Sequence, residues 1–317
     1  MTGGTGGGVL RMVQILLASY NGEKYIREQL DSLLGQNYPD IQILVRDDSS
    51  TDRTPEILEE YQEANPGRIT LIRDALSGGS AAANFFALLS HATADYVMFC
   101  DQDDVWLPQK VRRTLEVMQN EEKTSRLKEP ILVFSEYIVA DANLRPMDIR
   151  ESQLQIAKFY VTLPRLLVQN YVTGCTCMLN REAYSHLGVY EPGIPMHDWW
   201  AALYASAFGH IVHLPEKLML YRQHGDNQVA AKNVKSFRYR LDRLKDPKTR
   251  TSMQRNYRQA EIFRQRYGGS MPESGRKILD GFLELRDLPK PERVRKLIQG
   301  GYLKGDFVRA AAEILFL

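Results

Sequence analysis

The sequence predicts an α/β fold, with a mainly parallel central sheet flanked by helices and a C-terminal helical extension. In its first third, short apolar runs rich in β-branched residues alternate with segments of helical periodicity. Such alternation is typical of parallel sheets, whose ligands bind at the carboxyl ends of the strands. Carboxylate-rich segments follow these runs directly, so we expect the functional site at that edge.

Four strand–loop–helix units can be followed along the first half of the chain. The expected strands are Val13–Ala18, Ile41–Val45, Ile69–Ile72 and Tyr96–Phe99. The helical patterns that follow them run through Ile26 and Leu34, from Pro55, over Ala81–His91 and over Lys110–Gln119. The second half is less regular, with strands expected at Ile131–Phe134, Cys175–Leu179 and Lys217–Tyr221, and a helix that begins near His197.

Composition predicts one large domain with an appendage. The chain has 317 residues, 44% of them hydrophobic and 25% charged. We expect a disordered glycine-rich leader over residues 1–11, an α/β catalytic domain over 12–231 and a basic helical region over 232–317. No signal sequence or membrane-spanning run is evident, which favours a cytoplasmic protein. The three cysteines fit neither a disulfide framework nor the usual zinc spacing.

Charge is distributed unevenly along the chain. The net charge is +2, yet residues 232–317 hold 21 Lys and Arg against 10 Asp and Glu. With the apolar residues of Leu297–Leu317, this indicates peripheral contact with the anionic inner face of a membrane. The alternatives are a solvated helical face, or helices that pack on the catalytic domain or on a second subunit in a homo-oligomer. No nucleic-acid partner is expected.

Three carboxylates follow the fourth strand: Asp101, Asp103 and Asp104. They would repel one another unless a cation neutralised them, and Mg²⁺ or Mn²⁺ is commonly shared between carboxylates and substrate phosphates. The Asp-x-Asp spacing puts two side chains on one side of an extended segment. The alternative is a solvated acidic turn that caps the next helix.

Two other loops end in polar residues. Asp48 follows the second strand, where a carboxylate can accept hydrogen bonds from a base or a ribose hydroxyl. Asp52 suits the same role or simple helix capping. The run Ser19–Glu23 after the first strand is, by itself, equally compatible with an ordinary turn.

Together these motifs resemble family 2 glycosyltransferases of the GT-A fold. The resemblance covers Met12 to Gln228 and is strongest to bacterial rhamnosyltransferase-like members. It rests on four ordered motifs: Ala18–Glu23, Asp47–Asp52, Asn84–Phe86 and Asp101–Trp106. It implies that the sugar donor is bound by Ser19, Tyr20, Glu23, Asp48, Asn84 and Asp101, and that Asp103 is a direct metal ligand. The family often has an arginine before the asparagine, but Ala83 stands here.

The segment His197-Asp198-Trp199-Trp200 resembles the acidic motif of that family at the start of a helix. The resemblance implies that Asp198 deprotonates the acceptor hydroxyl, which an inverting transfer requires. Trp199 and Trp200 are expected to stack on the acceptor sugar, with core packing as the alternative. For Asp198 the alternative is a helix cap.

A late loop, Tyr221–Asn227, resembles the segment that closes over the sugar donor in this family. The resemblance implies that His224 is a further metal ligand and that Arg222 contacts the diphosphate. For His224 the alternative is an ordinary surface histidine. Gly174–Thr176 matches a segment on the acceptor side, so Thr176 is expected to contact the acceptor. A glycine bend in a core strand would look the same.

These expectations combine into an inverting, metal-dependent transfer of a hexosyl or deoxyhexosyl group. The donor is a nucleotide-diphosphate sugar, dTDP-L-rhamnose by resemblance, and the acceptor is a cell-surface polysaccharide or a lipid-linked glycan. The cofactor is Mg²⁺ or Mn²⁺. The alternatives are a catalytically inactive nucleotide-sugar or glycan-binding scaffold, and a nucleotidyltransferase. A dinucleotide oxidoreductase fits poorly because the first loop lacks G-x-G-x-x-G.

Overall fold

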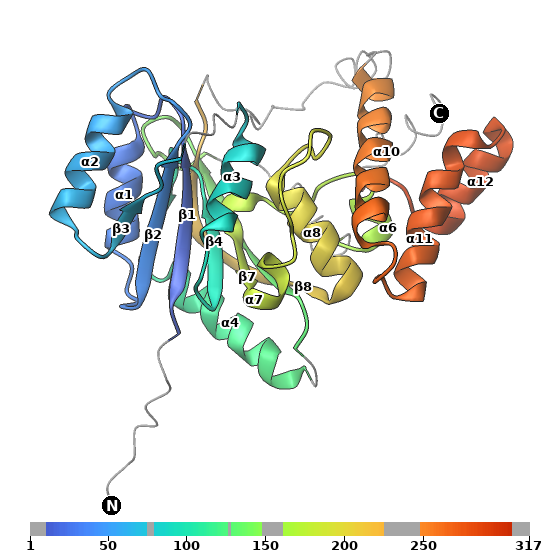
Figure 1. Ribbon diagram of the computed structural model, residues 1–317, viewed down its shortest axis with the longest axis horizontal. Coiled ribbons are helices and arrows are strands. Elements are labelled where there is room, and N and C mark those ends of the chain that lie inside the picture. Colours follow the sequence, from blue (N-terminus) through green and yellow to red (C-terminus); the bar gives the residue numbers. More distant parts are fainter. Residues whose placement is uncertain (1–10, 75–78, 126–127, 148–160, 225–247, 306–317) are drawn as a thin grey trace, which may run out of the picture.

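The computed structural model describes residues 11–74, 79–125, 128–147, 161–224 and 248–305 (Figure 1). Its eight-stranded sheet has the order β3-β2-β1-β4-β7-β6-β8-β5. The strands are β1 (Val13–Ser19), β2 (Ile41–Asp47), β3 (Ile69–Leu71), β4 (Tyr96–Cys100), β5 (Val105–Trp106), β6 (Ile131–Ala140), β7 (Cys177–Asn180) and β8 (His210–Arg222).

Helices lie on both sides of this sheet. Those that follow the first four units are α1 (Ile26–Leu34), α2 (Thr54–Ala64), α3 (Ala81–Ser90) and α4 (Lys110–Thr124). The others are α6 (Leu163–Leu166), α7 (Arg181–Tyr184), α8 (His197–Phe208), α10 (Lys248–Tyr267), α11 (Glu273–Glu284) and α12 (Lys290–Gly300). Two short 3₁₀ turns, η2 (Gly174–Thr176) and η3 (Leu285–Asp287), complete the described elements.

The expected mainly parallel sheet is confirmed. β1 pairs in parallel with both β2 and β4, β2 with β3, and β6 with β8. β7, however, lies antiparallel between β4 and β6, and β5 lies antiparallel on β8. The segment Cys175–Leu179, expected as one strand, begins as the η2 turn instead. β6 and β8 are also longer than expected, because β6 continues beyond Phe134 to Ala140 and β8 already begins at His210.

Alternate residues of the strands divide the core into two layers. Leu16 and Leu44 face one side of the sheet, while Ile15 and Ile43 face the other, and all four are buried. Burial on both faces explains why these strands read as continuous apolar runs rather than alternating ones.

The C-terminal helices complete one of these layers. In Figure 1, α10 lies beside α8, and α11 and α12 lie beyond α10, away from α1 and α2. Trp200 of α8 packs edge-on against Phe263 of α10 at 5.2 Å between ring centroids, and Leu297 of α12 is also in this cluster. The predicted domain boundary at residue 232 lies outside the described residues.

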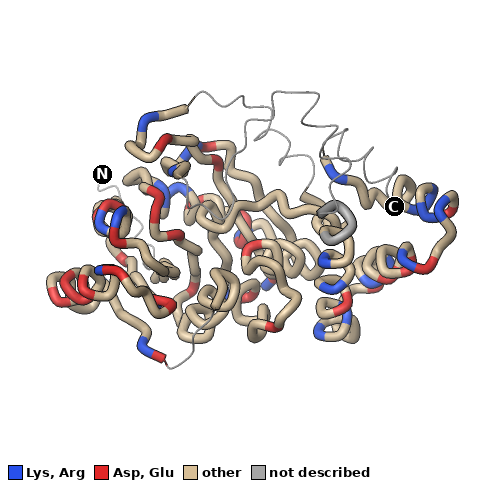
Figure 2. Tube along the Cα trace, turned by 90° about the horizontal axis from the view of Figure 1, so that it is seen from above, with Lys and Arg blue, Asp and Glu red and all other residues tan. Residues whose placement is uncertain are grey.

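Charged residues on these helices are largely paired with one another. Figure 2 shows acidic positions interspersed among the basic ones along them. The exposed pairs include Arg264–Asp280, Arg286–Glu261, Lys277–Glu273 and Lys296–Glu284. Exposed pairs of this kind contribute little to stability. The apolar faces of the helices, rather than these charges, hold them to the domain.

Candidate active site

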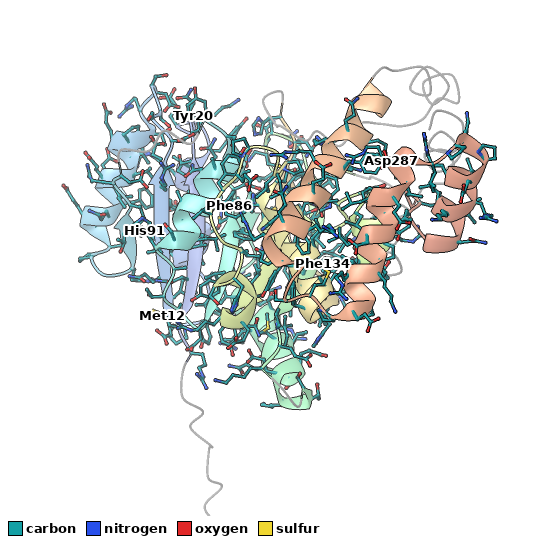
Figure 3. The ribbon with its side chains drawn as sticks, turned by 45° about the vertical axis from the view of Figure 1, so that its right-hand side comes forward. Met12, Tyr20, Phe86, His91, Phe134 and Asp287 are labelled. Atoms are coloured by element: carbon teal, nitrogen blue, oxygen red, sulfur yellow. The ribbon has the colours of Figure 1, made fainter. Side chains whose placement is uncertain are left out.

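The carboxyl ends of β1, β2 and β4 meet at one edge of the sheet. The register places Ser19 opposite Asp47 and Leu17 opposite Cys100, so the three following loops start side by side. In Figure 3, Tyr20 marks this edge and Met12 marks the opposite one. The expectation that the polar loops gather at one edge is therefore met by the strand pairing.

The loops after β1 and β2 are bonded to each other. The Asn21 side chain accepts a hydrogen bond from the Thr51 backbone N–H at 2.8 Å. The Glu23 carboxylate accepts from the Arg53 N–H, and the Glu23 N–H donates to Asp52, both at 3.0 Å. Asn21 adopts a φ of 47°, a left-handed conformation that asparagine tolerates. Glu23 and Asp52 thus shape the loops, whatever else they contact.

Gln102 joins the first loop to the acidic loop after β4. Its amide accepts from the Tyr20 N–H and donates to the Tyr20 carbonyl, both at 2.8 Å, and it lies 3.1 Å from the Ser19 hydroxyl. A Cβ on Gly22 would lie 2.3 Å from the Gln102 amide oxygen, so glycine is needed there. This bonding leaves the Tyr20 ring 56% exposed at the rim.

A buried arginine organises the end of β2. Arg46 is 1% exposed, and its guanidinium donates to both carboxylate oxygens of Asp74, at 2.7 to 3.1 Å. The same group contacts Asp48 at 3.3 Å and the Asn84 amide oxygen at 2.9 Å. Asp48 also accepts from the Gly79 N–H at 2.9 Å. The two predicted sugar-donor residues Asp48 and Asn84 are therefore neighbours, linked through Arg46.

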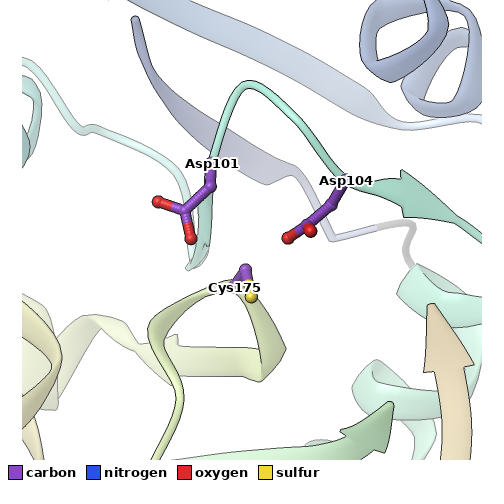
Figure 4. Close-up of side chains that lie close together, drawn as sticks. All are labelled: Asp101, Asp104 and Cys175. Atoms are coloured by element: carbon purple, nitrogen blue, oxygen red, sulfur yellow. The ribbon is translucent and has the colours of Figure 1, made fainter. Parts of the chain in front are cut away.

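The three carboxylates of the acidic loop lie in different surroundings. Asp101 and Asp104 turn toward the Cys175 thiol (Figure 4), with one ligand atom from each within 4.8 Å of the others. Burial, and then the charge of Asp103, raises the pKa of Asp101 to about 7. Burial also raises the pKa of Asp104 well above its usual range, and one of its oxygens has no hydrogen-bond partner among the described residues.

Asp103 faces the last described segment of the late loop. Its carboxylate lies 2.7 Å from Nε2 of His224, and both side chains are partly exposed. The structure thus brings together the two predicted metal ligands. An imidazole nitrogen beside a carboxylate suits Mn²⁺, and Mg²⁺ less well because it prefers oxygen ligands.

Arg222 is buried rather than extended toward the site. Its guanidinium donates to the backbone carbonyls of Asp103 and Ala142 at 2.7 Å and to the Glu28 carboxylate. Its own N–H donates to Asp104 at 3.0 Å. In this conformation Arg222 fixes the acidic loop against β8, so contact with a diphosphate remains a prediction.

Asp198 lies at the first turn of α8 and is 7% exposed. One carboxylate oxygen accepts from the Gly174 N–H at 3.0 Å and the other from the Trp199 N–H at 2.6 Å. Burial raises its pKa to about 6, although these bonds act in the opposite direction. His197 beside it is also buried, stacked on Phe85 at 3.7 Å, and burial lowers its pKa to about 3.

The three predicted acceptor residues are buried. Trp200 is 0% exposed and donates its indole N–H to the Leu187 carbonyl at 3.1 Å. Trp199 donates to the Leu166 carbonyl at 2.5 Å, and the Thr176 hydroxyl to the Thr173 carbonyl at 2.6 Å. These surroundings fit the alternative reading, core packing, better than stacking on a sugar.

Fold and edge together define a class, the glycosyltransferases of the GT-A fold. Residues 14–188 match the model of glycosyl transferase family 2, and the chain belongs to this family. It is 31% identical over 239 residues to the dTDP-rhamnosyl transferase RfbG of Shigella flexneri, covering 72% of this chain and 78% of that one. An uncharacterized glycosyltransferase of Nostoc is also 31% identical, covering 68% and 66%.

Solved structures support the fold alone, because their sequence identity is low. S. aureus TarS in complex with UDP-GlcNAc has a TM-score of 0.57 at 16% identity, covering 96% of this chain and 88% of that one. The mannosyltransferase PcManGT from Pyrobaculum calidifontis, in complex with GDP-Man and Mn²⁺, has a TM-score of 0.55 at 19% identity, covering 92% and 73%. Among the described residues, no helix is both long and apolar enough to span a bilayer.

Several residues at this edge were not singled out from the sequence. Arg46 is a charged residue inside an apolar strand, and this contrast could have identified it as a candidate for the site. Gln102 lies within the acidic motif, but its bonds depend on the fold. Glu28 and Lys110 look like ordinary helix residues. Beside Ala83, where the family often has arginine, the Asn84 amide is contacted by Arg46 from another element.

Proposed function

We propose that the chain is an inverting glycosyltransferase in which Asp198 is the general base. The observation that carries this proposal is the Asp198 carboxylate itself. It is buried near the acidic loop, and each of its oxygens accepts a backbone N–H. Helix capping accounts for neither contact, because the N-cap of α8 is Met196 and the Gly174 N–H comes from a separate element.

A carboxylate held in this way is suited to proton abstraction. With a pKa of about 6, Asp198 is mostly ionised at neutral pH, yet basic enough to take a proton from a hydroxyl in the transition state. The acceptor oxygen forms a bond to the anomeric carbon while the bond to the nucleoside diphosphate breaks. Asp198 receives the hydroxyl proton, and attack from the face opposite the leaving group inverts the anomeric centre.

Asp103 and His224 are the residues that would hold a divalent cation. Their contact at 2.7 Å and their partial exposure fit a site that opens toward the substrate. When bound, such a cation neutralises the charge that develops on a leaving diphosphate. Mn²⁺ suits this pair better than Mg²⁺, since one ligand is nitrogen.

The nucleotide part of the sugar donor is assigned to the loops after β1, β2 and β4. Tyr20 supplies an exposed ring, and Asp48 supplies a carboxylate for the base or ribose. The remaining assigned contacts are Ser19, Glu23, Asn84, Asp101 and Arg222. Of these, Arg222 requires the largest change, because it would have to leave Glu28.

We infer dTDP-L-rhamnose as the sugar donor and a cell-surface polysaccharide or lipid-linked glycan as the acceptor. The similarity to the dTDP-rhamnosyl transferase of Shigella flexneri supports the sugar. A shorter match, 34% over 112 residues, is to an E. coli glucosyltransferase whose name specifies a diphosphoundecaprenol-linked acceptor, which supports the lipid-linked class.

A direct test is nucleoside diphosphate release from a panel of nucleotide sugars with Mg²⁺ or Mn²⁺. We expect release to be fastest with dTDP-L-rhamnose and Mn²⁺, with the opposite anomeric configuration in the product by NMR. Faster reaction with UDP-glucose would refute the choice of sugar, and retained configuration would refute inversion. Binding without release from any donor would favour the inactive scaffold.

A further inference from the structure

Lys110 is a fully buried cation beside the acidic loop. It is the first residue of α4 and is 0% exposed. Its ammonium donates to the Cys175 carbonyl, lies 3.0 Å from the sulfur of Met219 and sits 3.8 Å from the centre of the Trp106 ring. Burying a charge is unfavourable unless its partners compensate, and an apolar side chain of similar length would avoid that cost.

The backbone that carries Lys110 is firmly held. Its N–H donates to the Leu107 carbonyl at 3.0 Å, and the Leu107 N–H donates to Leu218 of β8 at 3.0 Å. The buried Gln36 side chain bridges the same turn, donating to the Leu107 carbonyl at 2.9 Å and accepting from the Val111 N–H at 3.1 Å. The Lys110 ammonium therefore contacts the η2 turn from a backbone position that is held in place.

The other side of the η2 turn contacts the base. The Gly174 N–H donates to Asp198, and a Cβ on Gly174 would lie 2.8 Å from Nε2 of His197 and 3.2 Å from Cβ of Asp198. The turn is thus in direct contact with the first turn of α8. Cys175, whose carbonyl Lys110 holds, is the next residue along the chain.

We propose that Lys110 is a positioning residue, whose ammonium holds the η2 turn against Asp198 through the Cys175 carbonyl. This inference rests on the proposed role of Asp198 as base. Without the ammonium, the Cys175 carbonyl loses its buried partner, and the turn that presents the Gly174 N–H can shift. The loops that bind the sugar donor keep their own bonds, such as that between Asn21 and Thr51.

The first test compares Lys110→Met with Lys123→Met. Methionine keeps the length of the side chain and removes its charge and its hydrogen bond, while Lys123 is exposed near the other end of the same helix. We expect Lys110→Met to lower kcat about 10- to 100-fold, as a misplacement of about 1 Å does. Affinity for dTDP with Mn²⁺ should stay unchanged. A purely structural lysine would instead lower both together, and that result would overturn the proposal.

A double-mutant cycle tests whether Lys110 acts through Asp198. In the Asp198→Asn background, Lys110→Met should cause little further loss, because residues that act as a unit are not additive. Full additivity would overturn the inference. An unimpaired Asp198→Asn enzyme would refute the proposed base instead. If Lys110→Met does not fold, Lys110→Gln replaces it, and wild-type kcat in that variant would overturn the inference.

Discussion

The two halves of the catalytic edge are built in different ways. On the proposed sugar-donor side, strand register brings the ends of β1, β2 and β4 together, and short loops bond to one another across that edge. On the proposed acceptor side, Asp198 depends on η2 and on the packing of α8 against α10. The first arrangement follows from local patterns along the chain, whereas the second requires distant segments to pack correctly.

This difference predicts different consequences of substitution. Changes in the sugar-donor loops should affect binding and metal use, and leave the core intact. Changes around α8 should divide into those that affect mainly chemistry and those that affect mainly stability, because Asp198 contacts the η2 turn whereas Trp200, on the same helix, packs against α10.

The largest effect is expected for Asp103→Ala. This change removes the carboxylate beside His224, so the charge on the leaving diphosphate would lack its stabilising cation, a loss of several kcal/mol. Turnover measured across a Mn²⁺ titration should fall to background while the melting temperature stays the same. Asp287→Ala, at an exposed aspartate in η3, is the control. Near wild-type turnover at saturating Mn²⁺ would contradict the assignment.

Asp198→Asn should lower kcat about 10²- to 10⁴-fold, the usual contribution of a general base. The amide keeps the shape of the side chain but does not take a proton from the acceptor. For the acceptor, kcat and kcat/KM should fall together, while affinity for the sugar donor stays constant. The helix-cap alternative does not apply here, because Asp198 is the second residue of α8 and Met196 is its N-cap, so an unimpaired rate would assign the base to another carboxylate.

The pH dependence should follow the ionisation of Asp198. The ionised form is the active one, so kcat should be near its maximum above about pH 7, reach half of it at about pH 6 and fall about tenfold per unit well below that. The measurement is best made at saturating Mn²⁺, because a bound cation lowers the pKa of nearby Asp101. The residual kcat of Asp198→Asn should not fall at acidic pH. If it still falls, another group is responsible for the pH dependence.

Substitution of Trp200 tests the second region, which depends on the packing of α8 against α10. Trp200→Ala should lower the free energy of unfolding by about 3–5 kcal/mol, measured by denaturant titration, because the indole is completely buried. Trp200→Phe keeps much of the packing and should leave the acceptor KM unchanged. If Trp200→Phe instead raised the acceptor KM without loss of stability, the tryptophan would be a sugar contact.

The smallest effect concerns membrane contact by the C-terminal helices. Deleting everything after Pro291 would remove Leu297 from the core, so point changes on α12 are the sharper test. Arg295→Gln with Lys296→Gln should weaken sedimentation with anionic liposomes by about 1 kcal/mol per residue. Glu292→Gln on the same helix should strengthen it. If liposome binding is unchanged in both variants, the alternative is favoured, in which these helices only pack on the rest of the protein.

The sequence by itself determined the order of the first strands and helices and the edge at which the carboxylates gather. Apolar runs and helical periodicity act over a few residues, and parallel strands bring their carboxyl ends together without further information. The pattern therefore predicted Asp103 as a candidate, whereas Asp198 was predicted from the resemblance of His197–Trp200 to the acidic motif of the family.

Only the tertiary structure decided which of these side chains remain accessible. Trp200 is enclosed because α10, from the far end of the chain, covers α8, and Arg222 turns inward because Glu28 of α1 lies beside it. The antiparallel placement of β7 and the reach of Lys110 to Cys175 likewise join residues that are distant in sequence. Burial and pairing depend on what packs over a residue, and a local pattern carries no information about that.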